Sequence, residues 1–166
     1  MSPFSIVAAI PAHVPAIHAM VRELAQYEKL EHLVSGTAEN LQAELFGAQP
    51  VIEAVVALAD GAPVGFALYF HNYSTFLARK GLYLEDVYVQ PAHRRRGIGR
   101  ALLIHLARLA LERGCGRFEW SVLDWNQPAI EFYERLGATV MPEWRMVRVT
   151  GDALHTLAAR STFGLA

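Results

Sequence analysis

The stretch YLEDVYVQPAHRRRGIGR, residues 83–100, decides the fold of this 166-residue chain. Its beginning, 83–89, is rich in aromatic, β-branched and aliphatic residues and predicts a strand. Pro91 breaks that strand, and a run of arginine and glycine follows. From residue 98 to residue 110, apolar side chains recur at helical spacing. The stretch therefore predicts a strand and a helix joined by a glycine- and arginine-rich loop.

The loop has the features of a diphosphate site. A helix begins with backbone N–H groups that lack internal partners, and its dipole is positive there. Glycines allow close approach of a ligand, and the arginines add positive charge. A glycine turn with a solvated basic surface explains these local features equally well. A P-loop is excluded because no Gly-Lys-Ser/Thr follows, and Leu102 stands where a Rossmann fingerprint needs a third small residue.

Hydrophobic patterning on the N-terminal side predicts two helices and a run of antiparallel strands. The helices are expected at 14–27 and 38–45, the second with Thr37 as its cap. Strands are expected at 4–9, 51–58, 64–70 and 81–89. Asp60-Gly61 predicts a hairpin turn, and a loop is expected around Asn72 and Ser74.

On the C-terminal side, residues 118–122 alternate and predict a strand that returns through a helical crossover, hence parallel to 81–89. A short helix is expected at 126–135, followed by strands at 138–141 and 145–149 and a last helix from Asp152. The fold class is α/β (α+β). We expect one domain, 1–166, with a mixed, mostly antiparallel sheet of six to seven strands, one parallel crossover and flanking helices.

Composition limits the classes of function. Apolar residues make up 53% of the chain and charged residues 19%, which excludes a disordered chain. The net charge of −1 offers no basic field for nucleic acid or an anionic membrane. Cys115 is the only cysteine, no apolar run approaches the ~20 residues of a membrane span, and the seven histidines show no metal-ligand spacing. We expect a cytoplasmic protein without a metal.

Two signatures together resemble the GNAT superfamily of N-acetyltransferases. The first is Arg94-x-x-Gly97-x-Gly99 behind its strand, and the second is LDWNQPAIEFYERLGA, residues 123–138. Segments 23–28 and 65–69 and the sequence from Trp144 onward resemble the diamine acetyltransferase branch, which includes spermidine/spermine and thialysine acetyltransferases.

Within that branch, residues 73–76 and 122–127 look closer to the thialysine enzyme. Ser74 and Phe76 stand where the spermidine enzyme tends to have an acidic residue and an indole. The departure puts polyamine specificity in question. The resemblance also implies a homodimer paired around the C-terminal strands.

The resemblance implies an acetyl-CoA site in which the backbone of 87–89 pairs with the pantetheine arm and polarises the thioester carbonyl. Tyr133 would donate a proton to the departing thiolate, or else only pack beside Phe132. Asn126 would bind the pantetheine arm, cap the short helix, or do both. The implied acetyl-CoA site comprises Val87, Tyr88, Val89, Arg94, Arg95, Arg96, Gly97, Ile98, Gly99, Arg100, Asn126, Pro128, Ala129 and Tyr133.

An amine attacks a thioester only when neutral, and near pH 7 about one lysine-like amine in a thousand is neutral, a penalty of roughly 4 kcal/mol. Glu85, in the middle of an apolar strand, is the candidate base, acting directly or through water. Asp86 would point to the opposite face unless a bulge intervenes. Either acid could instead form an ion pair with an arginine.

By resemblance, Tyr27 and Glu28 line the amine pocket together with Glu85 and Asp86. Alternatively, Tyr27 completes the apolar stripe of its helix and Glu28 is solvated.

The expected activity is direct acetyl transfer from acetyl-CoA to a small primary amine: a thialysine-like amino acid, a diamine or a polyamine. Two alternatives stay open. One is a non-catalytic acetyl-CoA-binding regulatory module, which would not need Glu85 or Tyr133. The other is a protein or peptide N-acetyltransferase. The presence of both residues favours the enzyme.

Overall fold

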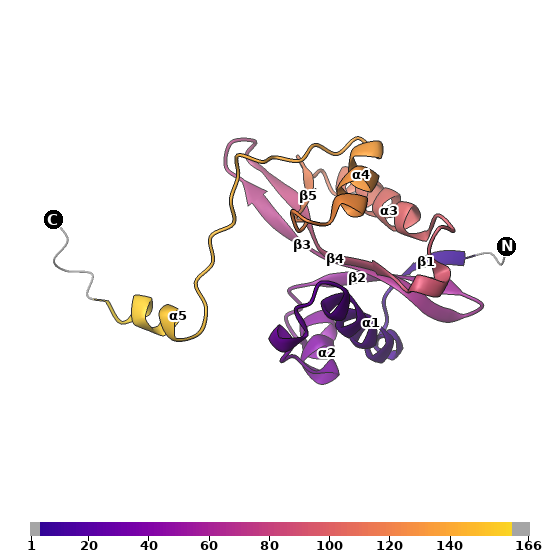
Figure 1. Ribbon diagram of the computed structural model, residues 1–166, viewed down its shortest axis with the longest axis horizontal. Helices are drawn as coiled ribbons and strands as arrows, with labels where there is room; N and C mark the ends of the chain where they lie inside the picture. Colours follow the sequence, from indigo (N-terminus) through magenta and orange to yellow (C-terminus); the bar gives the residue numbers. More distant parts are fainter. Residues whose placement is uncertain (1–3, 161–166) are drawn as a thin grey trace. The chain divides into compact units, whose positions relative to one another are not determined.

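A computed structural model describes residues 4–160 (Figure 1), and the chain divides into two compact units between Ser121 and Val122. The first unit is built on one five-stranded sheet with the strand order β1-β2-β3-β4-β5. Its first four strands are antiparallel neighbours, and β5 is parallel to β4, which confirms the predicted crossover. The strands are β1 Phe4–Ala8, β2 Glu53–Ala59, β3 Ala62–Ser74, β4 Arg79–Val89 and β5 Phe118–Trp120.

Three helices cover the two faces of this sheet: α1 Val14–Tyr27, α2 Ala38–Phe46 and α3 Ile98–Glu112. The first two lie on one face and α3 on the other (Figure 1). Thr37 caps α2 as predicted, with its Oγ1 accepting from the backbone N–H of Asn40 at 3.2 Å. Short 3₁₀ turns at Pro11–His13, Glu31–Leu33 and Pro91–His93 complete the connections.

The core between the sheet and α1 and α2 is formed by the apolar stripe of α1 and the inward-facing residues of β2 and β3. Its fully buried members include Ile17, Val56 and Phe66. On the other face α3 buries Ile98, Leu102 and Leu106. Burying each such side chain stabilises the fold by about 1.5–3 kcal/mol. Helices therefore pack on both faces of the sheet, and β4 lies between β3 and β5.

A β-bulge interrupts the pairing of β3 with β4. Leu68 pairs with Asp86 and Tyr69 pairs with Leu84, so Glu85 is the extra residue of the bulge. Such an insertion shifts the alternation of side chains along the strand. It places the cross-strand pair Leu68 and Asp86 on the face that carries α1, because Leu68 belongs to the core beneath that helix.

The β3–β4 hairpin is longer than predicted, and the expected loop at Asn72 and Ser74 is wrong. Asn72 pairs with Gly81 and Ser74 with Arg79 inside the ladder. Polar residues are accommodated there because the ladder satisfies their backbone groups. Ser74 is buried, and its Oγ accepts from the N–H of Leu77 at 3.2 Å, which closes the turn.

The second unit contains α4 Gln127–Arg135 and α5 Gly151–Ala158, close to the predicted helices. The strands predicted at 138–141 and 145–149 are wrong for the described chain, so its sheet has five strands and not six to seven. A strand needs a neighbour for its N–H and C=O groups, and these segments have none among residues 4–160.

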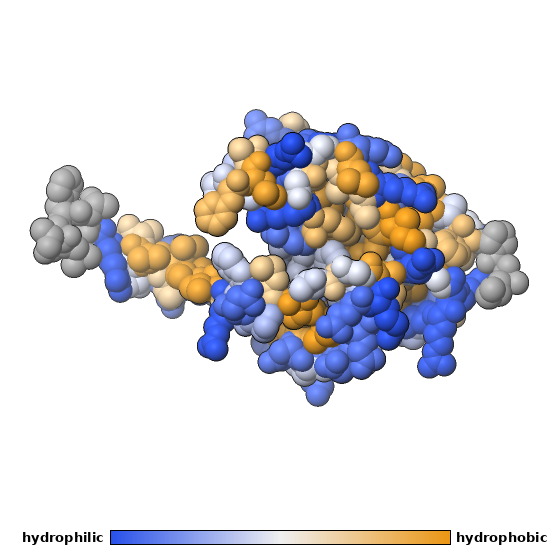
Figure 2. Space-filling view, turned by 90° about the horizontal axis from the view of Figure 1, so that it is seen from above, coloured by the Kyte–Doolittle hydropathy of each residue, from blue (hydrophilic) through white to orange (hydrophobic). Residues whose placement is uncertain are grey.

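The segment between the two helices of this unit exposes apolar side chains, with Val147 90% accessible. Helix α5 also presents an apolar surface (Figure 2). Across residues 4–160, no helix combines the length and the apolar character that crossing a membrane requires.

Candidate functional site

The loop after β4 has the geometry of an anion site at the start of α3. Gly97 is the N-cap and adopts φ +82 and ψ 1, a left-handed conformation that favours glycine. No side chain caps this helix, and a Cβ built on Gly97 would meet no atom within 4 Å. Gly97 itself has no side chain that could cap the helix, so its position leaves room beside the start of α3, which fits a diphosphate.

The four arginines of this loop have different surroundings. Arg94, Arg95 and Arg100 are exposed, whereas Arg96 is half-buried and its Nη1 lies 3.2 Å from the Nδ1 of His93. Arg94, although exposed, contacts the strand before it, because its Nε donates to the carbonyl oxygen of Val89 at 2.9 Å. The predicted basic group is thus present around the helix start, but its members are not equivalent.

One edge of β4 is unpaired where the pantetheine arm is expected. Residues 87–89 pair with β3 on one side. On the other side β5 pairs only with Leu82, Tyr83 and Leu84, and no strand of the described chain extends that ladder. The backbone of 87–89 can therefore accept an added strand, as the acetyl-CoA prediction requires.

Glu85 and Asp86 are adjacent at the bulge, and the carboxyl group of Glu28, at the C-cap of α1, is near enough to act on the charge of Asp86. Burial raises the pKa of Asp86 to about 6, and the charges of Glu85 and Glu28 raise it further in the same direction. Burial also raises the pKa of Glu28. Asp86 was expected on the opposite face unless a bulge intervened, and the bulge is what brings it near Glu85.

Within residues 4–160, no ion pair neutralises the carboxyl cluster formed by Glu28, Glu85 and Asp86. Among the residues that the structure describes, no lysine or arginine forms an ion pair with Glu85 or Asp86. The predicted alternative of a structural ion pair is therefore wrong here. Uncompensated negative charge in a partly buried site favours a cationic ligand.

Tyr27 and Glu28 connect this cluster to α1, since Tyr27 is the last residue of that helix and Glu28 its C-cap. The ring of Tyr27 is 43% exposed and lies 5.7 Å from the guanidinium carbon of Arg94. Tyr27 therefore only partly completes the apolar stripe of α1. Glu28 is not freely solvated, because burial raises its pKa.

The second unit carries the remaining predicted residues. Asn126 occupies the N-cap position of α4, but its side chain makes no capping hydrogen bond, so the capping alternative is wrong. Pro128 lies in the first turn of α4, where its missing N–H is tolerated, and Ala129 donates to the carbonyl of Asn126. The Tyr133 ring packs against Phe132 with centroids 5.4 Å apart.

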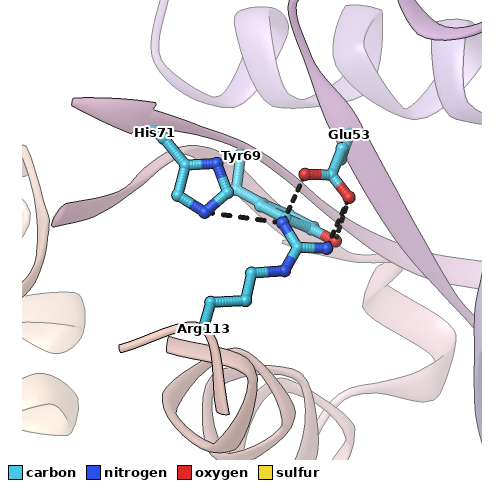
Figure 3. A network of polar contacts seen from close by, with 4 residues as sticks. All are labelled: Glu53, Tyr69, His71 and Arg113. Carbon is cyan, nitrogen blue, oxygen red and sulfur yellow. Dashed lines mark hydrogen bonds and ion pairs between the residues drawn. The ribbon is translucent and has the colours of Figure 1, made fainter. Parts of the chain in front are cut away.

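A separate polar cluster lies at the other end of α3, around its C-cap Arg113 (Figure 3). The Nη2 of Arg113 donates to Glu53 at 2.7 Å, and the Tyr69 hydroxyl donates to the same carboxylate at 3.4 Å. Arg113 holds the pKa of Glu53 below its usual value, whereas burial raises the pKa of Tyr69 to about 12. Burial lowers the pKa of His71, which lies 3.5 Å from Arg113.

The charges of this cluster compensate one another, so it ties α3 to β2 and β3 rather than awaiting a ligand. Sequence reasoning missed it because Glu53 and Arg113 are 60 residues apart and belong to no motif. A groove of about 430 Å³ lies next to it, lined by Leu45, Pro50, Val51, Ile52, Glu53, Phe70 and His71. None of the predicted site residues lines that groove. Among residues 4–160, no cluster of His, Cys, Asp and Glu is suited to a metal ion.

Ser74 and Phe76, which depart from the pattern of the spermidine enzyme, lie in the β3–β4 hairpin. The hydroxyl of Ser74 is engaged in closing the turn, and Phe76 is 97% exposed at the turn itself. The structure thus shows how Ser74 is used locally, while Phe76 projects into solvent.

Known proteins resemble this chain along most of its length. The sequence profile described as "Acetyltransferase (GNAT) family" matches residues 17–138. Thialysine N-epsilon-acetyltransferase of Mus musculus is 41% identical, with 87% of this chain and 91% of the mouse protein covered. L-ornithine N5-acetyltransferase of Arabidopsis thaliana is 34% identical, with 90% of this chain and 85% of the plant protein covered.

Solved structures agree with the fold. An integron cassette protein from the mobile metagenome of V. cholerae superimposes with a TM-score of 0.79 at 25% identity, covering 96% of this chain and 99% of its own. An aminoglycoside N-acetyltransferase in complex with CoA gives a TM-score of 0.72 at 18% identity. The match covers 90% of this chain and 96% of that enzyme. At that identity the second likeness concerns the fold alone.

Proposed function

Because the chain belongs to the GNAT acetyltransferase family, whose members use acetyl-CoA, we propose that this N-acetyltransferase acetylates a small primary amine. The preferred acceptor is a thialysine-like amino acid, with diamines and polyamines next. Relatives named for thialysine and L-ornithine are 34–41% identical over most of their length. A spermidine/spermine acetyltransferase-like protein of Homo sapiens is 30% identical, and only 22% of that protein is covered.

The observation that carries the proposal is the uncompensated carboxyl cluster on the bulge of β4. Its charge attracts an amine in the ammonium form, which predominates near pH 7. Asp86, with a pKa of about 6, is mostly ionised at that pH and suits the role of holding the ammonium. Glu85 is exposed at the bulge, where it can reach a substrate or a water molecule.

In the proposed mechanism Glu85 takes a proton from the bound amine, directly or through one water. The neutral nitrogen then attacks the thioester carbon without a covalent enzyme intermediate, and the C–S bond breaks as the C–N bond forms. The nitrogen loses its second proton, which balances the proton that the departing thiolate takes up. A positioned base contributes about 10²–10⁴-fold, which offsets the roughly 4 kcal/mol cost of deprotonation. The unpaired backbone of 87–89 binds the pantetheine arm, and an N–H of that edge polarises the carbonyl.

Tyr133 is proposed as the acid that protonates the departing thiolate. Tyr133→Phe removes only the hydroxyl and keeps the ring that packs on Phe132. We expect kcat, measured by CoA-thiol release, to fall by about 10²-fold. The Kd of acetyl-CoA, measured by calorimetry, should change little. Equal loss of turnover and of acetyl-CoA affinity would assign Tyr133 a packing role.

We also propose that residues 1–166 act as one acetyltransferase domain in a cytoplasmic homodimer. The matched family profile, 17–138, crosses the boundary between the two compact units, which supports one functional domain. The exposed apolar side chains of 138–149 support pairing with a second copy. Sedimentation equilibrium would measure the mass, and a monomer at micromolar concentration would contradict the dimer.

The deciding experiment measures CoA-thiol release from acetyl-CoA with thialysine, lysine, ornithine, putrescine, spermidine, spermine and a lysine-containing peptide. We expect the highest kcat/KM with a thialysine-like amino acid. Turnover of the peptide alone would identify a peptide acetyltransferase. Acetyl-CoA binding without turnover of any amine would favour a regulatory binding module.

A further inference from the structure

We propose that Arg94 is a positioning residue that couples the acetyl-CoA loop to the amine pocket, rather than a simple phosphate ligand. The inference rests on the proposed function, because it takes Tyr27 and Glu28 as part of the acceptor pocket. Its basis is a set of contacts in which one guanidinium contacts both substrate regions.

The first contact is with β4. The Nε of Arg94 donates to the carbonyl oxygen of Val89 at 2.9 Å, at the end of the unpaired edge. Its guanidinium carbon also lies 5.3 Å from the ring centroid of Tyr88, which is buried. An arginine placed over an aromatic face is attracted by the ring, and the planar group stacks well. Arg94 thus fixes the loop against the strand that would hold pantetheine.

The second contact is with α1. The same guanidinium carbon lies 5.7 Å from the centroid of Tyr27, the last residue of the helix. Glu28, the next residue, belongs to the carboxyl cluster at the bulge. The guanidinium therefore lies near both rings, one from the cofactor strand and one from the acceptor helix.

Neighbouring polar contacts reinforce the same connection. The Nε2 of Gln90, in the loop, donates to the Oε1 of Glu23 on α1 at 3.1 Å. Burial raises the pKa of Tyr88, and the neighbouring carboxyl group of Glu23 acts in the same direction. The loop after β4 therefore contacts α1 at two places, through Gln90 and Glu23 and through Arg94 and Tyr27. The second contact is the one next to Glu28 in the sequence.

Arg95 provides a matched comparison on the same loop. Like Arg94 it is exposed and positively charged, but among the described residues its side chain makes no cation–π contact with Tyr27 or Tyr88. If an arginine here serves only to attract phosphate, Arg94→Met and Arg95→Met should act alike. If Arg94 couples the two regions, only Arg94→Met should alter the use of the amine.

The test measures kcat, the amine KM at saturating acetyl-CoA, and the Kd of acetyl-CoA by calorimetry, for Arg94→Met, Arg94→Lys and Arg95→Met. We expect Arg94→Met to raise the amine KM about tenfold. Arg94→Lys should bind acetyl-CoA nearly as well as the wild type, because it keeps the charge. Its amine KM should stay raised, because lysine lacks the planar group. Arg95→Met should weaken acetyl-CoA binding and leave the amine KM at the wild-type value. Circular dichroism verifies that each variant is folded.

A double-mutant cycle with Tyr27→Leu provides the sharper readout. Arg94→Met and Tyr27→Leu should be non-additive in amine KM, while Arg95→Met and Tyr27→Leu should be additive. Additivity in the first cycle, or a wild-type amine KM in Arg94→Met, would overturn the proposal.

Hydrogen exchange supplies a readout that needs no acceptor. Acetyl-CoA should slow amide exchange in the last turn of α1 in the wild type and in Arg95→Met, but not in Arg94→Met when each is saturated with acetyl-CoA. Equal protection in all three would refute the coupling even if no amine were a substrate. Failure of every amine in the acetylation panel, in contrast, would refute the proposed function and leave this exchange test intact.

Discussion

Two regions of the same sheet place partly buried carboxyl groups in opposite electrostatic settings. At the start of β2, Glu53 meets the guanidinium of Arg113, and its pKa is lowered. At the bulge of β4, Asp86 meets the acids Glu85 and Glu28, and its pKa is raised. Burial raises the pKa of both groups and is the main cause at Asp86, whereas at Glu53 the hydrogen bonds and charge of Arg113 outweigh it.

The two settings have opposite effects on the stability of the fold. The Glu53–Arg113 pair joins the end of α3 to the sheet, although an exposed pair contributes about 1 kcal/mol or less. The carboxyl cluster lowers stability because its charges are partly buried without a counter-ion. Such a cost is typical of sites that bind or react, where a ligand supplies the missing charge.

The largest expected effect is on activity at the bulge. Glu85→Gln should lower kcat/KM at pH 7 by about 10²–10³-fold, since it removes the base, and activity should recover as the pH approaches the pKa of the amine. The matched control is Glu112→Gln, an exposed acid at the end of α3. The measurement is a pH–rate profile. A profile with the wild-type shape in Glu85→Gln would exclude Glu85 as the base.

The next effect is on stability at the same place. The folded pKa of Asp86 is about 6 against an ordinary 3.8, so the folded protein binds this proton more tightly than the unfolded chain. Wild-type stability should therefore fall as the pH rises through about 4 to 6 and stay low above it. Asp86→Asn should be more stable than the wild type at pH 7 by up to roughly 3 kcal/mol.

Urea unfolding at pH 4 and pH 7 checks this prediction. The two proteins should be nearly equally stable at pH 4, and the amine KM of Asp86→Asn should rise. A wild type that is as stable as Asp86→Asn at pH 7 would mean that water or a counter-ion already neutralises the cluster.

The smallest effect concerns the compensated region. Glu53→Gln should lower the free energy of unfolding at pH 7 by about 1 kcal/mol or less, with amine KM unchanged. Because the pKa of Glu53 is lowered in the folded state, its contribution is present above its ordinary pKa of 4.5 and is lost as the pH falls below it. Urea unfolding across this range measures the gap. A difference in the free energy of unfolding between the wild type and Glu53→Gln that grew at acid pH would contradict the structural role of Glu53. A changed amine KM would contradict it as well.

Local patterns were sufficient for most of the elements in the first unit. The apolar stripe of α3, the cap Thr37 and the turn Asp60-Gly61 depend on neighbours in the sequence, and all three occur where they were predicted. The anion-binding geometry at Gly97 also follows locally, because a left-handed N-cap in this loop favours glycine. The roles proposed for the site residues stay predictions.

The sequence-based predictions were wrong for features that depend on partners distant in the chain. The strands expected at 138–141 and 145–149 have suitable residues but no neighbouring strand in the described chain. The ladder that carries Asn72 and Ser74 forms because β4 supplies a partner for polar residues that a local pattern assigns to a loop. In both cases strand pairing, rather than composition, decided the outcome.

The sequence by itself determined the strand–loop–helix unit, the parallel crossover and the family, because these rest on periodicity and on a motif of adjacent residues. Only the tertiary structure decided that Glu85 is the bulged residue, that Asp86 joins it beside Glu28, and that Arg94 lies against Tyr27 and Tyr88. The physical reason is that register, burial and charge environment are properties of segments that meet in space. Those segments are separated by tens of residues along the chain.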